Sequence, residues 1–137
     1  MKTINTLTIC LSSLILLSVL TSCEDKDEPN YESFLIQVDS IQVSDNITIN
    51  ESFDIRLYGT IGTNGCYQFS QFETEKQGNN IVIKAWGKFD KNSNICPTVM
   101  VYLDNEKLSY QFDEKGTYTI KVIQPDNDFL EKQISVE

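Results

Sequence analysis

Hydrophobic and polar residues alternate with a period of two through most of this chain beyond residue 33. Phe53, Ile55 and Leu57 alternate with the polar residues Asp54 and Arg56, which is the pattern of a strand with one buried face. Such segments recur about every ten residues and are separated by Gly-, Asn- and Asp-rich turns. The absence of a long 3.6-residue period in this part predicts an all-β antiparallel sandwich of about seven or eight strands. The expected strands lie within residues 34–43, 51–62, 66–75, 81–89, 98–104, 108–113, 117–124 and 129–137.

Residues 1–22 have a different pattern, which is typical of a secretory signal peptide. Lys2 supplies a positive start, residues 7–20 form an apolar run, and small residues precede Cys23. An uncleaved transmembrane anchor is the alternative, but the apolar run is shorter than the roughly 20 residues that a membrane-spanning helix needs. We therefore predict that residues 1–22 are removed.

The residues at the expected cleavage site carry a resemblance to a known class of protein. Leu20-Thr21-Ser22-Cys23 resembles the lipobox of bacterial lipoproteins. The resemblance implies that a diacylglyceryl group is attached to the Cys23 thiol and that cleavage follows directly before this residue. Acyl chains would then hold the protein to the outer membrane, because each buried methylene contributes about 0.8 kcal/mol.

Residues 23–33 are expected to form the lipidated cysteine and a flexible acidic tether, because they are polar and lack an apolar period. Lys26, Asp27 and Glu28 resemble the export signal of Bacteroidota surface lipoproteins, which implies display on the cell surface. The alternative is a solvated spacer on a protein that faces the periplasm. Asp39-Ser40-Ile41 matches the O-glycosylation pattern of the same bacteria, so Ser40 is a candidate modification site.

The charge and residue content exclude several functions. All 20 acidic residues and every basic residue except Lys2 follow Cys23, so the side chains of the mature chain sum to a net charge of −10. This argues against a nucleic-acid partner, since phosphate binding needs clustered Lys and Arg. The chain has no histidine, which removes His-dependent nucleophilic catalysis and His metal sites. A carboxylate pair such as Asp54 and Glu73 could in principle hydrolyse glycosides, but solvated surface charge is the interpretation we favour. We expect no enzymatic activity, metal or cofactor.

Two cysteines remain in the mature domain once Cys10 leaves with the signal and Cys23 is lipidated. Cys66 and Cys96 are expected to form a disulfide, because the chain is exported to an oxidising compartment. Closing a loop of this size stabilises a fold by about 3–4 kcal/mol in the chain-entropy model.

The end of the chain resembles immunoglobulin-like domains. Glu114-x-Gly116-x-Tyr118 is similar to the pattern that opens their strand F, where the Tyr hydroxyl bonds back to the chain. Antibody domains place a cysteine two residues after this Tyr, whereas this chain has Ile120. The resemblance implies an Ig-like sandwich over residues 34–137.

The aromatic residues are expected mainly in the core of this sandwich, although a strip of them could form a contact surface for a glycan or a protein. Tyr58 and Trp86 are expected to face solvent, since both have polar neighbours on their strand face. The residues expected in the core are Tyr67, Phe69, Phe72, Tyr102 and Tyr110.

Two function classes remain open. The first is a membrane-anchored, non-catalytic binding or accessory module whose ligand is an unknown protein or glycan. The second is a protease or toxin inhibitor, in which the loops at residues 62–65 and 90–94 beside the two cysteines make the inhibitory contact.

Overall fold

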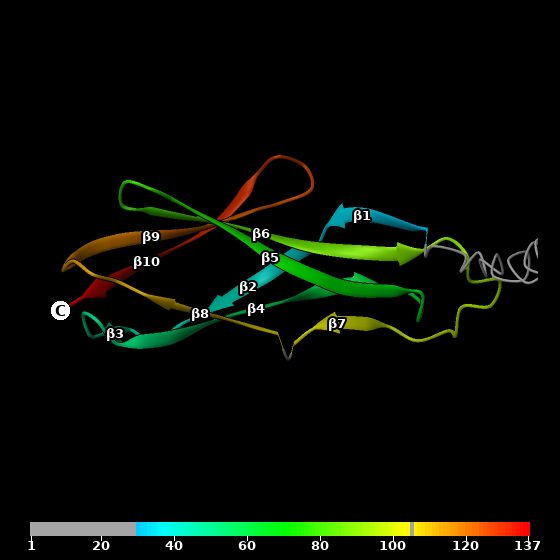
Figure 1. Cartoon of the computed structure of the whole chain (residues 1–137), viewed down its shortest axis with the longest axis horizontal. Coiled ribbons are helices and arrows are strands. Elements are labelled where there is room, and N and C mark those ends of the chain that lie inside the picture. The colour runs from blue at the N-terminus through cyan, green and yellow to red at the C-terminus, as the bar shows by residue number, and fades with distance from the viewer. Residues whose placement is uncertain (1–29, 105) are drawn as a thin grey trace, which may run out of the picture.

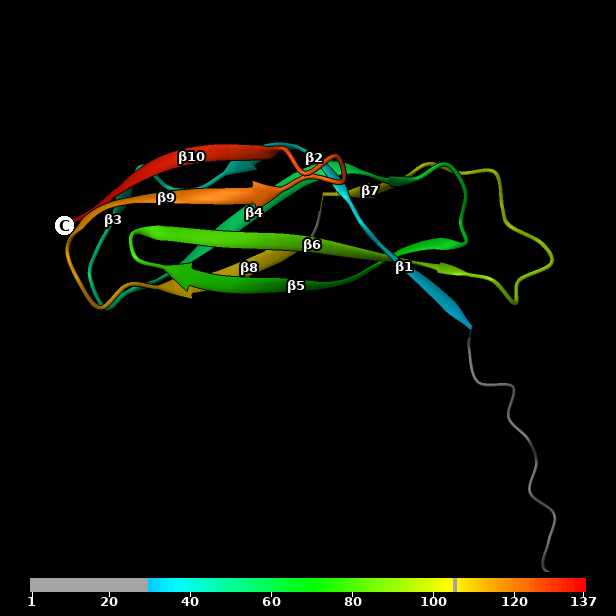
Figure 2. The ribbon, with the colours of Figure 1, turned by 90° about the horizontal axis from the view of Figure 1, so that it is seen from above.

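A computed structural model describes residues 30–104 and 106–137, which form two β-sheets packed face to face (Figure 1). The C-terminus lies at one end of the elongated sandwich, and the start of β1 lies at the other (Figures 1 and 2). The strands of the described part are β1 (Tyr31–Leu35), β2 (Gln37–Gln42), β3 (Asn46–Ile47), β4 (Ser52–Gly62), β5 (Tyr67–Gln77), β6 (Asn80–Asp90), β7 (Val101–Leu103), β8 (Lys107–Gln111), β9 (Gly116–Ile123) and β10 (Phe129–Val136).

The larger sheet, which we call sheet A, is built around β6. One edge of β6 pairs with the antiparallel β5 over its full length. The other edge is shared, because the first part of β6 runs parallel to β9 and the last part runs antiparallel to β1. β9 and β10 form a hairpin, and the two-residue β3 runs parallel to the end of β10.

The smaller sheet, sheet B, is built around β4. β2 pairs with one edge of β4, while β7 and β8 follow one another along its other edge. The single strand expected over residues 34–43 is in fact two strands, since β1 belongs to sheet A and β2 to sheet B. The chain passes between the sheets at Ile36, which is almost completely buried. This crossing joins the two layers near the N-terminal end of the domain.

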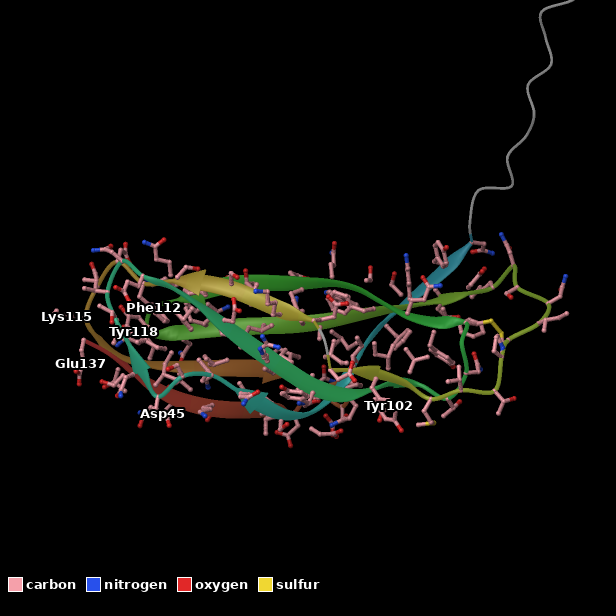
Figure 3. The ribbon with its side chains drawn as sticks, turned by 90° about the horizontal axis from the view of Figure 1, so that it is seen from below. Asp45, Tyr102, Phe112, Lys115, Tyr118 and Glu137 are labelled. Atoms are coloured by element: carbon pink, nitrogen blue, oxygen red, sulfur yellow. A yellow bond between two sulfur atoms is a disulfide. The ribbon has the colours of Figure 1, made fainter. Side chains whose placement is uncertain are left out.

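The core lies between the sheets and consists mainly of branched aliphatic side chains. Alternate residues of β4, β6 and β9 point inward, as period two requires. Phe112 and Tyr118 stack with their ring centroids 4.1 Å apart near the C-terminal end (Figure 3). The largest fully buried aliphatic side chains of the described part are Ile36, Ile55, Leu57, Ile81, Ile83, Leu103, Ile120 and Val122.

The all-β sandwich is confirmed, but three details of the expectation are corrected. The fold has two parallel pairings, so it is not purely antiparallel; side-chain periodicity carries no information about strand direction. The described residues form ten strands, because the first segment divides and β3 adds a short one. β1 already begins at Tyr31, so part of the expected tether is paired with β6.

The expected hydrogen bond from the Tyr118 hydroxyl back to the chain is present at the start of β9. The hydroxyl of Tyr118 donates a hydrogen bond of 3.1 Å to the backbone carbonyl of Glu114. The buried ring is thus tied to the turn that precedes its own strand.

Candidate functional site

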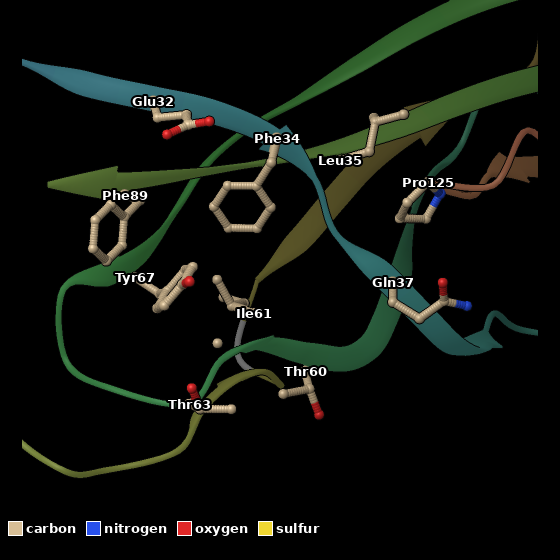
Figure 4. Close-up of a pocket in the computed structure, with 11 residues that line it drawn as sticks. Glu32, Phe34, Leu35, Gln37, Thr60, Ile61, Thr63, Tyr67, Phe89 and Pro125 are labelled. Carbon is tan, nitrogen blue, oxygen red and sulfur yellow. The ribbon is translucent and has the colours of Figure 1, made fainter. Parts of the chain in front are cut away.

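A cleft of about 540 Å³ opens between the two sheets, where the chain crosses from β1 to β2 (Figure 4). It receives side chains from the strand ends of both sheets and from the β9–β10 turn. A cleft of this size is within the range of small-ligand sites. The lining residues are Glu32, Phe34, Leu35, Gln37, Thr60, Ile61, Gly62, Thr63, Tyr67, Phe89 and Pro125.

Three aromatic rings form one end of this cleft. Phe34 meets Tyr67 edge to face, with centroids 5.6 Å apart and an interplanar angle of 81°. Tyr67 in turn packs against Phe89 at 4.7 Å. These separations are those of favourable aromatic pairs, so the three rings support one another as a single apolar wall, which we call the aromatic wall.

Two glycines allow the aromatic wall to lie directly against the backbone. A Cβ on Gly87 would lie 2.4 Å from Cζ of Phe34, and a Cβ on Gly62 would lie 2.1 Å from Cγ of Tyr67. Both distances are far inside van der Waals contact, so no other residue fits without moving a ring. The aromatic wall can therefore occupy this position only because residues 62 and 87 are glycines.

Polar groups surround the aromatic wall on the open side of the cleft. Thr60, Thr63 and Gln37 contribute hydroxyl and amide groups to its lining. The carboxylate of Glu32 forms an ion pair of 3.0 Å with the ammonium group of Lys91. The aromatic wall together with the neighbouring hydroxyl, amide and paired charged groups suits an amphipathic ligand. No cluster of three or more His, Cys, Asp or Glu residues with metal-binding geometry occurs in residues 30–104 and 106–137.

A disulfide holds the loops beside the cleft. Cys66 and Cys96 are bonded, with their Cα atoms 5.3 Å apart, as the sequence predicted. Next to it, the N–H of Gly65 donates a hydrogen bond of 2.8 Å to the carbonyl of Pro97. The turn between β4 and β5 is therefore joined to the loop at residues 91–100, and the two segments proposed for an inhibitory contact do lie at the same end of the molecule.

The sequence profile of the ORF11 beta-sandwich domain matches residues 55–136, which is more than half of the chain. The chain belongs to the ORF11 beta-sandwich family. No curated protein and no solved structure shows significant similarity to it.

The ORF11 beta-sandwich match begins within β4 and ends with β10. Tyr67 and Phe89 of the aromatic wall therefore lie inside the matched region, whereas Phe34 on β1 precedes it. The cleft is completed by a strand outside the family match. Residues 30–104 and 106–137 of this ORF11 beta-sandwich protein contain no helix that could span a membrane.

The two carboxylates considered for glycoside hydrolysis are not brought together. Asp54 lies on β4 of sheet B, and hydrogen bonds from Ser109 and then Lys107 lower its pKa. Glu73 lies on β5 of sheet A, where hydrogen bonds from Trp86 and then Lys84 lower its pKa. Each carboxylate is thus kept ionised by its own partners on a separate sheet of the ORF11 beta-sandwich.

The aromatic residues follow the sequence expectation in most cases. Trp86 and Tyr58 are half-exposed on the outer faces, and the Tyr58 hydroxyl donates a hydrogen bond of 2.7 Å to the side-chain oxygen of Gln42. Tyr102 was expected in the core, but it is 55% exposed because it occupies the outward position of β7. The residues that do pack against the core are Tyr67, Phe69, Phe72 and Tyr110.

Ser40, the candidate O-glycosylation site, is exposed on β2 at the edge of sheet B. The signal peptide at residues 1–22, the lipidation site Cys23 and the export signal at Lys26, Asp27 and Glu28 lie outside the described residues. The cleft itself was not predicted from the sequence. Its signal was the pair of glycines at the last position of β4, Gly62, and at a buried position of β6, Gly87.

Proposed function

We propose that this ORF11 beta-sandwich protein is a lipid-anchored, non-catalytic binding module of the bacterial outer membrane, displayed at the cell surface. The anchor is the lipidated Cys23 of the lipobox-like sequence. The observation that carries the binding role is the cleft beside the aromatic wall. A soluble domain gains no stability from leaving such an apolar surface open, whereas a ligand can cover it.

The chemistry of the cleft limits the class of ligand. The faces of Phe34 and Tyr67 suit flat apolar groups, such as the C–H face of a sugar ring or a peptide side chain. Thr60 and Thr63 offer hydroxyl groups that both donate and accept hydrogen bonds. A glycan or a short peptide segment combines these two requirements, so the ligand belongs to one of these classes.

The test is capture of envelope glycans and peptides by the detergent-solubilised processed protein, followed by titration of each captured ligand. Thr63→Arg places a long side chain at the rim without removing a core group, and we expect it to weaken binding at least tenfold. Thr48→Arg is the matched control, because Thr48 is exposed beyond β3 and does not line the cleft. Equal affinity of the two variants would exclude the cleft as the binding site.

An inhibitor is the second candidate function, and the joined loops favour it. The hydrogen bond from Gly65 to Pro97 and the adjacent disulfide hold the β4–β5 turn and the loop at residues 91–100 together at one end of the sandwich. A rigid exposed loop loses little entropy on docking to a protease or toxin. Titration of the protein against host and bacterial proteases tests this, and no inhibition at micromolar excess would reject it.

We further propose that the domain is a variant of the Ig-like sandwich. The hydrogen bond between Tyr118 and Glu114 supports the relationship, because it is the corner expected of such domains. The parallel pairing of β6 with β9 is a departure from their antiparallel sheets.

A further inference from the structure

Four exposed apolar side chains lie on the loop at residues 91–100 and on β7. Ile95 is 84% exposed, and Val99, Met100 and Tyr102 are 52%, 44% and 55% exposed. We call these four residues the apolar tip. The loop extends beyond the ends of the neighbouring strands (Figures 1 and 2). The aromatic wall of the cleft does not use any of these side chains.

The apolar tip is held in an outward position rather than left to collapse onto the domain. The residue after Ile95 is the disulfide-bonded Cys96, and the next, Pro97, accepts the hydrogen bond from Gly65. The carbonyl of Ile95 accepts a hydrogen bond of 3.0 Å from the hydroxyl of Ser93. These ties fix the backbone on both sides of the most exposed hydrophobic residue, so little entropy remains to be lost when it is buried.

The loop at residues 91–100 lies at the end of the molecule where the described chain begins, and Tyr102 is set back from this end on β7 (Figure 3). The N–H of Lys91, the first residue of the loop, donates a hydrogen bond of 3.0 Å to the carbonyl of Asn30. The C-terminus and Asp45 lie at the opposite end (Figure 3). Seven residue steps separate Cys23 from Asn30, and a fully extended chain covers about 25 Å in that number of steps. A lipid on Cys23 therefore keeps Asn30 and this loop close to the membrane surface.

We propose that the apolar tip inserts into the lipid leaflet to which Cys23 is anchored, an inference that rests on the proposed lipidation. Ile95, Val99 and Met100 would enter the acyl region, and Tyr102 would lie at the headgroup level, where amphipathic aromatic rings are favoured. Lys91 is the one charged residue of the loop at residues 91–100, and it forms an ion pair of 3.0 Å with Glu32. Contact with lipid is thus driven by apolar burial rather than by headgroup charge.

Insertion would orient the sandwich on the membrane. The long axis would stand away from the surface, because the tip lies at one end of that axis (Figure 1). The cleft opens along the side between β1 and β4, and its Pro125 end lies away from the aromatic wall (Figure 4). The tip would then hold the cleft at a defined height above the leaflet, where a surface glycan or peptide is presented to it.

The experiment places a tryptophan in the apolar tip of the processed protein, from which residues 1–22 have been removed. The single native tryptophan is first removed by Trp86→Phe. Ile95→Trp is then introduced in that background, and Val99→Trp is a second, independent probe. The proteins are reconstituted in vesicles of phosphatidylethanolamine and phosphatidylglycerol, with and without bromine atoms on the acyl chains. Asp45→Trp in the same background is the control, because Asp45 lies at the opposite end.

We expect bromolipids to quench the Ile95→Trp and Val99→Trp fluorescence at least twofold and to leave the Asp45→Trp fluorescence unchanged. Intact mass and flotation of the same samples report the anchor independently. Protein that carries the acyl mass and floats, but whose tip tryptophans are not quenched, would overturn insertion and leave the anchor intact. Protein that lacks the acyl mass would overturn the anchor and the insertion that rests on it.

Discussion

Gln124 is the one fully polar side chain buried among the described residues, and it joins the two sheets. It directly follows β9 and is 5% exposed. Its side-chain oxygen accepts a hydrogen bond of 3.0 Å from the N–H of Val38, and its side-chain nitrogen donates one of 3.1 Å to the carbonyl of Val38. Val38 borders the bulge of β2, where the register with β4 shifts. The side-chain amide of Gln124 therefore pairs with the backbone of β2 as a neighbouring strand would.

Gln124→Ala should be strongly destabilising. It leaves one buried N–H and one buried carbonyl of Val38 without partners, and each costs about 1–3 kcal/mol. We expect a loss of about 2–5 kcal/mol in the free energy of unfolding. For a domain of about 100 residues this lowers Tm by at least about 10 °C. Thermal unfolding followed by circular dichroism measures the change, and Gln133→Ala on the exposed face of β10 is the matched control.

Gln124→Glu separates hydrogen bonding from packing, because it keeps the shape of the side chain. An ionised carboxylate can accept from the N–H of Val38 but has no proton for the carbonyl, whereas the protonated acid can satisfy both groups. Burial raises the pKa of the introduced carboxyl in the folded state. Its stabilising contribution is therefore present at low pH and lost as the pH rises through the folded pKa. The role assigned to Gln124 would be refuted if the Gln124→Glu variant remained as much less stable than the wild type at low pH as at neutral pH. It would also be refuted if Gln124→Ala were as stable as the Gln133→Ala control.

Three further outcomes are expected. Reduction of the Cys66–Cys96 disulfide should lower the stability by about 3–4 kcal/mol, and an unchanged Tm in the presence of reductant would contradict this. Because hydrogen bonds from Trp86 and Lys84 lower the pKa of Glu73, the contribution of that carboxylate to stability is present above the unfolded pKa and is lost as the pH falls through the folded value. The fluorescence of Trp86 should therefore change with a midpoint below 4.5, and Glu73→Gln should remove the transition. Neutralising Lys26, Asp27 and Glu28 together should protect the protein from protease added to intact cells, whereas equal digestion before and after would identify these residues as a spacer.

The sequence predicted the local features of this fold better than its connections. Alternation placed β4, β6 and β9 correctly, because each has one face against the core and one toward solvent. The pairing of Cys66 with Cys96 followed from the number of cysteines left after export. The parallel arrangement of β6 and β9 was missed, because period two is the same for either strand direction.

The cleft was missed for a related reason. Phe34, Ile36 and Val38 fit one face of the single strand that the sequence predicts over residues 34–43. The chain instead changes sheets at Ile36, so Ile36 and Val38 are buried while the ring of Phe34 is left half-exposed beside Tyr67. A crossing between layers depends on contacts that are distant in sequence, and alternation alone does not reveal it. Gly62 and Gly87 lie at the site, but the sequence does not show that the rings of Tyr67 and Phe34 pack against them.

We propose that a lipid on Cys23 anchors this domain by the end that carries the cleft and the apolar tip. The most direct measurement is metabolic labelling with an alkynyl fatty acid, combined with membrane fractionation, of the wild type, Cys23→Ala and Cys10→Ala. We expect label and membrane association in the wild type and in Cys10→Ala, because Cys10 would leave with the signal peptide, and we expect loss of both in Cys23→Ala. A Cys23→Ala protein that is still labelled and still fractionates with the membrane would contradict this proposal.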